Sequence, residues 1–263
     1  GVLSGIHPEF LHQLRVALRR LRSAVSVFPD TDRSGHFAAE MRWLAAQIGG
    51  ARDWDVFVFE TLPLARKALP GSDAISEIRR RTMPLRRAAW RKAQRAIATE
   101  RYQALKHGLR QPARTVPDAA PGRSVNIGSQ SDLPHYATSV LQRRYTKVRR
   151  RGRSLSRQGW DELHALRIAV KKLRYPVEFF FPLFDTDRAP ELRSRLTALQ
   201  DVLGLINDSA TTQQLLDSAI RADTPELARA VGMVAGWAEG RSSALRRELN
   251  SAWKAFRDTK VFW

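Results

Sequence analysis

The amino-acid sequence predicts an all-α protein made of two similar helical bundles, and three observations support this fold class. Apolar residues recur at helical spacing along most of the chain. A segment rich in proline, glycine and serine divides the chain near its middle, and motifs on either side of that segment repeat. We expect a tandem repeat of a four-helix unit, with two antiparallel bundles related by a pseudo-two-fold axis.

Helical periodicity is clearest in three stretches, where apolar residues lie three or four positions apart, as on one face of an amphipathic helix. These residues are Leu11, Leu14, Leu18, Leu21, Val25 and Phe28, then Leu163, Leu166, Val170, Leu173 and Val177, then Leu192, Leu196, Leu199, Leu203 and Ile206. No stretch combines strand alternation with hairpin turn signals. The short apolar run 56–59 is therefore interpreted as buried helix. Trp43, Trp90, Trp160, Trp237 and Trp253 occupy apolar helical positions, and we expect them in the core.

The middle segment has the composition of a linker and sets the predicted domain boundaries. Residues 111–134 read QPARTVPDAAPGRSVNIGSQSDLP, without apolar periodicity. We expect a first bundle over residues 1–110, a linker over 111–133, and a second bundle over 134–263.

Three motifs occur in both halves in the same order, which supports the repeat. HQLRVALRRLR at 12–22 aligns with HALRIAVKKLR at 164–174, DTDR at 30–33 with the same letters at 185–188, and IGGARD at 48–53 with LGLIND at 203–208. A helical stretch, about 134–158, precedes the motif in the second half. We expect the first unit to lack this N-terminal helix and to expose apolar residues of its 10–28 helix, unless a partner chain or upstream residues cover them.

Composition indicates an anionic partner. The 263 residues carry a formal net charge of +19, and 43% of them are hydrophobic, which is enough for a core. There is no cysteine, which excludes disulfides and thiolate metal sites and fits a reducing compartment. No apolar run approaches the roughly 20 residues of a membrane helix, and no signal peptide is visible.

The basic residues of the repeated motif share one side of their helix. At about 100° per residue, His12, Arg15, Arg19 and Arg22 fall within an arc of about 80° beside the apolar stripe. His164, Arg167, Lys171 and Arg174 have the same spacing, and Arg20 and Lys172 lie on the other flank. A basic helix face is usually only solvated surface. The recurrence of this spacing in both halves favours a function.

The chemistry of these residues suits a phosphate polymer. The guanidinium group matches phosphate oxygens in pairs, and lysine acts as a movable point charge. From position 12 to position 22 the row is about 15 Å long, which fits an extended phosphate chain better than a single phosphate. We expect the two rows to face each other across the pseudo-two-fold axis and to line one basic groove or cavity.

These motifs, with GARDWDV at 50–56 and LGLINDSA at 203–210, resemble the CHAD domain, the conserved histidine α-helical domain, over nearly the whole chain. The resemblance implies two four-helix bundles with a central basic cavity that binds inorganic polyphosphate, in a cytoplasmic protein associated with polyphosphate granules. It assigns this binding to His12, Arg15, Arg19, Arg20, Arg22, His164, Arg167, Lys171, Lys172 and Arg174. CHAD domains often follow a CYTH triphosphate-tunnel domain, so such an enzymatic domain upstream of Gly1 is a further expectation.

Other functions have weaker support. Nucleic-acid binding is the alternative, because net charge alone does not separate phosphate polymers, although no RNP-type aromatic pair or helix-turn-helix signature is present. A catalytic His12 or His164 would need a carboxylate or a second ligand beside it, and the neighbours on its face are cations. Asp53 and Asp55 resemble a DxD metal site, but capping or pairing with arginine is the preferred interpretation. We expect no enzyme activity, no cofactor, no metal and no membrane partner.

Overall fold

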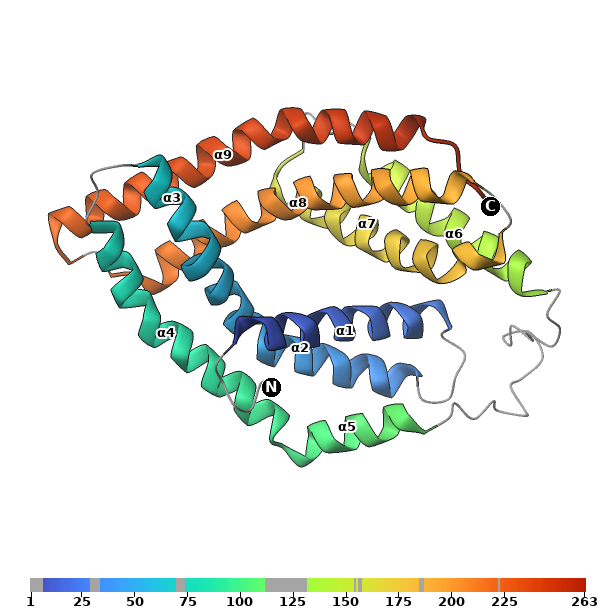
Figure 1. The fold of residues 1–263 in the computed structure, drawn as a ribbon, viewed down its shortest axis with the longest axis horizontal. Coiled ribbons are helices and arrows are strands. Elements are labelled where there is room, and N and C mark those ends of the chain that lie inside the picture. Colours follow the sequence, from blue (N-terminus) through green and yellow to red (C-terminus); the bar gives the residue numbers. More distant parts are fainter. Residues whose placement is uncertain are drawn as a thin grey trace. The chain divides into compact units, whose positions relative to one another are not determined.

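The computed structural model is helical through almost all of the residues that it describes, which are 7–28, 34–69, 74–111, 132–153, 155, 158–184, 187–221 and 223–263 (Figure 1). In these ranges no residue lies in a β-strand, so the all-α fold class is confirmed. Most of the predicted linker, residues 112–131, and the first DTDR motif, residues 30–33, lie outside the described residues.

The helices follow one another with short connections where these are described. The first half contains α1 (Pro8–Val27), α2 (Ser34–Val56), the π-helical η1 (Phe57–Thr61), α3 (Leu62–Ala68), α4 (Ala74–Ile97) and α5 (Glu100–Arg110). The second half contains α6 (Asp132–Arg151), α7 (Trp160–Phe180), the 3-10 turn η3 (Phe181–Leu183), α8 (Arg188–Ala219) and α9 (Pro225–Asp258).

The chain forms two compact units whose boundaries differ from the expected ones. Unit 1 comprises Gly1–Ala119 with Thr211–Glu239, and unit 2 comprises Ala120–Ala210 with Gly240–Trp263. The end of α8 and the start of α9 therefore belong to unit 1, whereas the sequence placed all of 134–263 in the second bundle. The physical reason is apolar packing, because Leu216, Leu227 and Val234 are buried in one cluster with Phe57 and Leu62.

Unit 1 has two apolar clusters. One joins α1, α2, α4 and α5, which lie side by side in part (Figure 1), through Leu11, Leu18, Met41, Leu44, Ile48, Trp90 and Leu105. The other surrounds the junction of α2 and α3. There the 56–59 run is helical, as expected, with Phe57 and Val58 each 1% exposed. The helix widens to a π-turn at this point, and Phe59 remains 43% exposed.

Unit 2 buries both of its predicted apolar stripes. On α7, Leu163, Leu166, Val170, Leu173 and Val177 are all buried, and α6 lies along this helix (Figure 1). On α8, Leu192, Leu196, Leu199, Leu203 and Ile206 are buried as well.

The apolar stripe of α1 is only partly covered. Leu11 and Leu18 are buried, but Leu21 and Phe28 are each 37% exposed. Among the described residues, none forms a helix ahead of α1 in the way that α6 precedes α7. The exposure of Leu21 and Phe28 agrees with the expectation that the 10–28 helix leaves apolar residues uncovered.

Candidate anion-binding site

The first row of basic residues lies on α1, whose start is well defined. The His7 side chain accepts a hydrogen bond from the Glu9 backbone N–H at 3.3 Å, and Pro8 occupies the first turn, where its missing N–H costs nothing. His12, Arg15 and Arg19 are half-buried, while Arg20 and Arg22 are exposed. The row is therefore partly sheltered, as its position beside the apolar stripe predicts.

Two features describe the surroundings of this row. A Cβ atom placed on Gly49 of α2 would lie 3.3 Å from Arg15 Nη1, so the glycine lets the guanidinium lie close to the α2 backbone. Arg19 Nε is buried and has no hydrogen-bond partner among the residues that the structure describes. A buried donor without a partner is costly, and an anion would satisfy it.

The second row lies on α7 and has a similar pattern of burial. His164, Arg167, Lys171 and Arg174 are half-buried, and Lys172 is exposed. Arg174 Nε donates to Glu178 Oε1 at 2.8 Å, which ties this arginine to a carboxylate. In the first copy Ser26 stands in the place of Glu178, so Arg22 meets no carboxylate from that position.

His164 is positioned by two neighbours. Its Nδ1 lies 3.1 Å from Oδ1 of Asn207 on α8, and its ring stacks on Trp160 with centroids 5.0 Å apart. Because the asparagine oxygen can only accept, Nδ1 donates in this pair and Nε2 is left for another partner. Trp160 is 39% exposed, so its expected place in the core is wrong: it lies in the first turn of α7, where it packs on the histidine.

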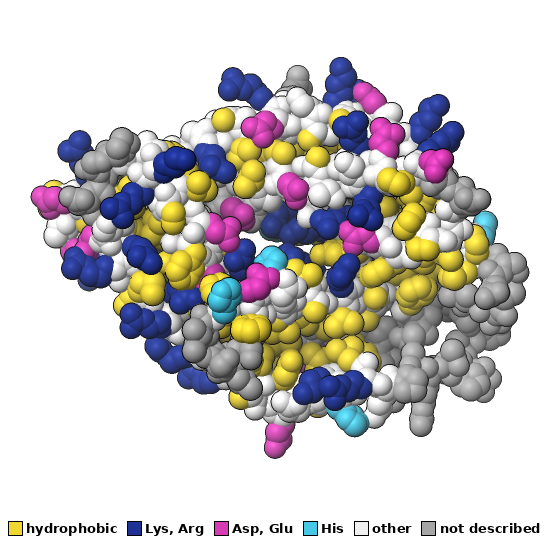
Figure 2. Space-filling view, viewed as in Figure 1, with side chains coloured by type: hydrophobic (Ala, Val, Ile, Leu, Met, Phe, Trp, Pro, Cys, Tyr) yellow, Lys and Arg dark blue, Asp and Glu magenta, His cyan; other side chains and the backbone are white. Residues whose placement is uncertain are grey.

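The structure places the ten predicted site residues in two separate rows, one on α1 in unit 1 and one on α7 in unit 2. In each row the histidine and the next two cations are half-buried, and Arg20 and Lys172 are exposed. Sequence reasoning did not single out Gly49, Asn207 or Trp160 for the site. Gly49 and Asn207 lie in the repeated IGGARD and LGLIND motifs, and this repetition could have marked them as candidate site residues. On the face shown in Figure 2, Lys and Arg side chains are spread over the surface and are not gathered in one patch.

The possible metal site at Asp53 and Asp55 has a structural explanation for Asp55. This carboxylate is buried, and Oδ1 accepts from Arg86 Nε at 2.7 Å and from Trp90 Nε1 at 2.9 Å. The preferred interpretation, pairing with arginine, holds for this residue. Within the described ranges, no group of three or more metal-ligating side chains comes together.

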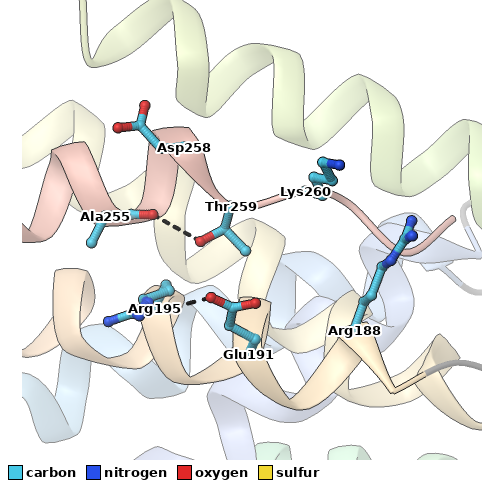
Figure 3. A pocket seen from close by; sticks show the side chains of 7 residues that line it. All are labelled: Arg188, Glu191, Arg195, Ala255, Asp258, Thr259 and Lys260. Atoms are coloured by element: carbon cyan, nitrogen blue, oxygen red, sulfur yellow. Dashed lines mark hydrogen bonds and ion pairs between the residues drawn. The ribbon is translucent and has the colours of Figure 1, made fainter.

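A surface hollow in unit 2 lies apart from the basic row. It has a volume of about 380 Å³ and lies where the start of α8 meets the end of α9 (Figure 3). Arg188, Arg195 and Lys260 line it together with Glu191 and Asp258. Glu191 lies 3.7 Å from Arg195, and Thr259 Oγ1 donates to the Ala255 carbonyl at 2.8 Å. Because two carboxylates share this hollow with the cations, it is a poorer anion site than either basic row.

Comparison with known proteins places the chain in a family. The profile of the CHAD domain matches residues 1–217. The fold is similar to the crystal structure of the CHAD domain from the plant Ricinus communis, with a TM-score of 0.78 and 24% identity over 98% of this chain and 85% of that one. It is also similar to PptA from Streptomyces chartreusis, with a TM-score of 0.71 and 17% identity over 94% and 90% of the two chains. No curated protein sequence matches. None of the described helices is long and apolar enough to span a bilayer.

Because the family profile matches residues 1–217 of the 263, the chain belongs to the CHAD domain family.

Proposed function

We propose that this protein binds inorganic polyphosphate without chemically changing it, and that the two basic rows hold the polymer. The observation that carries the proposal is the half-buried setting of His12, Arg15 and Arg19 on α1 and of His164, Arg167 and Lys171 on α7, at the same spacing. Like charges kept in a sheltered row repel one another, and a polyanion lying along the row removes that cost.

Each residue type has a role in this proposal. Arg15, Arg19, Arg22, Arg167 and Arg174 bind phosphate oxygens in pairs, and Lys171 supplies a point charge. His164 offers Nε2 as a further donor when it is protonated, since Asn207 holds Nδ1. The exposed Arg20 and Lys172 bind phosphate groups of the polymer that lie toward the solvent. A single polymer engages both rows in one groove or cavity. The protein localises to polyphosphate granules in the cytoplasm.

A pair of matched double variants tests the proposal. Arg19→Glu with Lys171→Glu reverses one charge in each row, and Arg221→Glu with Arg229→Glu reverses two exposed charges outside both rows. The row variant should lose at least about tenfold in affinity for long-chain polyphosphate, because a charged hydrogen bond contributes about 1.5–3 kcal/mol. Its helicity by circular dichroism should be unchanged.

The control variant and competing polymers decide between specific and diffuse binding. Equal losses in the two double variants would show that only overall charge matters, and the proposed rows would then not be a site. Single- and double-stranded DNA, competed against labelled polyphosphate at one salt concentration, should displace it poorly. Efficient displacement by DNA would favour nucleic-acid binding by the same surface.

A further inference from the structure

One face of α1 presents apolar side chains in the pattern of a helix-pairing seam. Phe10, Leu14, Ala17, Leu21, Ala24 and Phe28 follow one another at alternating spacings of four and three residues. This is the spacing of positions that pair packed helices. Phe10 is 51% exposed, and Leu21 and Phe28 are each 37% exposed. At about 1.5 Å per residue the seam is roughly 27 Å long.

The repeated motif shows what covers the corresponding face of α7. The motif alignment pairs Leu14, Ala17, Leu21, Ala24 and Phe28 with Leu166, Ala169, Leu173, Pro176 and Phe180. All five residues of α7 are buried, with Leu166 and Leu173 at 0% and Phe180 at 3% exposure. Helix α6 packs along α7, and its Arg144 contacts the backbone of Lys172 beside this face. The same sequence pattern is therefore buried in unit 2, whereas in unit 1 Ala17, Leu21 and Phe28 are exposed and Leu14 and Ala24 are half-buried.

The contact between α6 and α7 also includes a polar anchor. The Arg144 guanidinium of α6 donates to the backbone carbonyl of Lys172 on α7, and burial lowers the pKa of Arg144, with repulsion from Arg143 adding to the effect. Arg20 is the counterpart of Lys172 on α1. A helix that docks there with a donor at the matching position would find an equivalent carbonyl.

We propose that the seam on α1 is a docking surface for one amphipathic helix with the chemistry of α6, packed as α6 packs on α7. The seam lies on the side of α1 opposite the row of His12, Arg15 and Arg19, so the docked helix would leave that row accessible. A second copy of the chain is a poorer occupant. Pairing two such seams would bring Arg20 of two copies together, in molecules that each carry a net charge of +19.

A chain extended by a second copy of α6 tests the proposal directly. Residues 132–158 are fused immediately before His7, which reproduces the connection from α6 to α7, because His7 precedes α1 as Gly159 precedes α7. The sequence has no cysteine, so Leu21→Cys provides a single thiol in the seam. The fused helix should slow labelling of this thiol at least tenfold relative to the unextended chain. A thiol introduced by Gln103→Cys, on the exposed side of α5, should react equally fast in both chains.

The matched control is a fused helix without its apolar seam. Val140→Asp with Leu141→Asp in the added copy alone should restore the labelling rate of the unextended chain, because both residues are buried where α6 packs. Equal protection by both fused helices, or no protection by either, would overturn the proposal. Protection in the unextended chain that grows with protein concentration would also overturn it, since a second copy would then occupy the seam. The outcome does not depend on polyphosphate binding.

Discussion

At the scale of single residues, the sequence predicts which side chains of a helix share a face, but it does not predict what they meet. The spacing from His12 to Arg22 places these side chains beside the core, and the half-burial of His12, Arg15 and Arg19 confirms that position. The contact of His164 with Asn207 could not be predicted, because the two residues are 43 positions apart and only the packing of α7 on α8 brings them together. The prediction that Trp160 lies in the core was wrong, because an aromatic residue in the first turn can pack on its own helix, here on His164.

Gly49 offers a test of how the first row is positioned. Gly49→Ala should stabilise α2 by about 0.5–1 kcal/mol, because glycine is a poor residue inside a helix. It should also weaken polyphosphate binding by severalfold, since the new methyl group would lie 3.3 Å from Arg15 Nη1 and displace the guanidinium.

Gly50→Ala is the matched control for this change, because a Cβ atom there meets nothing within 4 Å. It should raise the free energy of unfolding similarly and leave binding unchanged. Urea unfolding and titration with polyphosphate measure both effects. If the two variants bind equally well, Arg15 does not depend on the glycine.

At the scale of helices, the periodic stretches were predicted well and their irregularities were not. The stripes on α7 and α8 are buried as expected. The π-turn at η1 was not predicted, because it changes the hydrogen bonding of a helix by one residue while the apolar pattern of the run remains helical. The assignment of residues 211–239 to unit 1 was also missed, since periodicity shows that a helix has an apolar face but not which other helix covers it.

A buried ion pair between Asp55 and Arg86 adds to the apolar packing of α2 on α4. Asp55→Ala should lower the free energy of unfolding by about 3 kcal/mol, because it leaves the charge of Arg86, whose side chain is only 13% exposed, without its partner. Glu60→Ala removes the partner of Arg52 at the surface, where Glu60 is 55% exposed, and should cost less than about 1 kcal/mol. Denaturant unfolding distinguishes the two. Similar losses would mean that the buried pair contributes no more than a surface pair.

At the scale of the whole molecule, the sequence predicts an all-α chain with a repeated motif, and the helical fold is confirmed. Whether the two rows act on one polymer can be measured in solution. Each phosphate that a cation neutralises contributes a slope of about −0.7 to the dependence of log affinity on log salt concentration for a single-stranded polyanion. If the eight Arg and Lys residues of the two rows act together, the slope should be about −5 to −6. The four of one row alone would give a slope of about −3.

A salt series on the wild-type chain, with affinity followed by fluorescence titration, gives this slope. We expect the steeper value. A value near −3 in the wild type would show that one row alone holds the polymer. The variant with Arg19→Glu and Lys171→Glu should have a shallower slope than the wild type.

The passage of α8 and α9 through both units has a consequence for the inheritance of mutations. Residues encoded in the second half of the gene, among them Leu216, Leu227 and Val234, complete the core that begins with Phe57 in the first half. A gene fragment that stops in the segment between α5 and α6 would therefore encode a first half with part of its interior missing. Damaging substitutions at 211–239 would behave genetically as lesions of the first half, and compensating changes should arise around η1 and α3. The two halves of the chain can diverge in sequence, but the first half needs residues 211–239 of the second to complete its core.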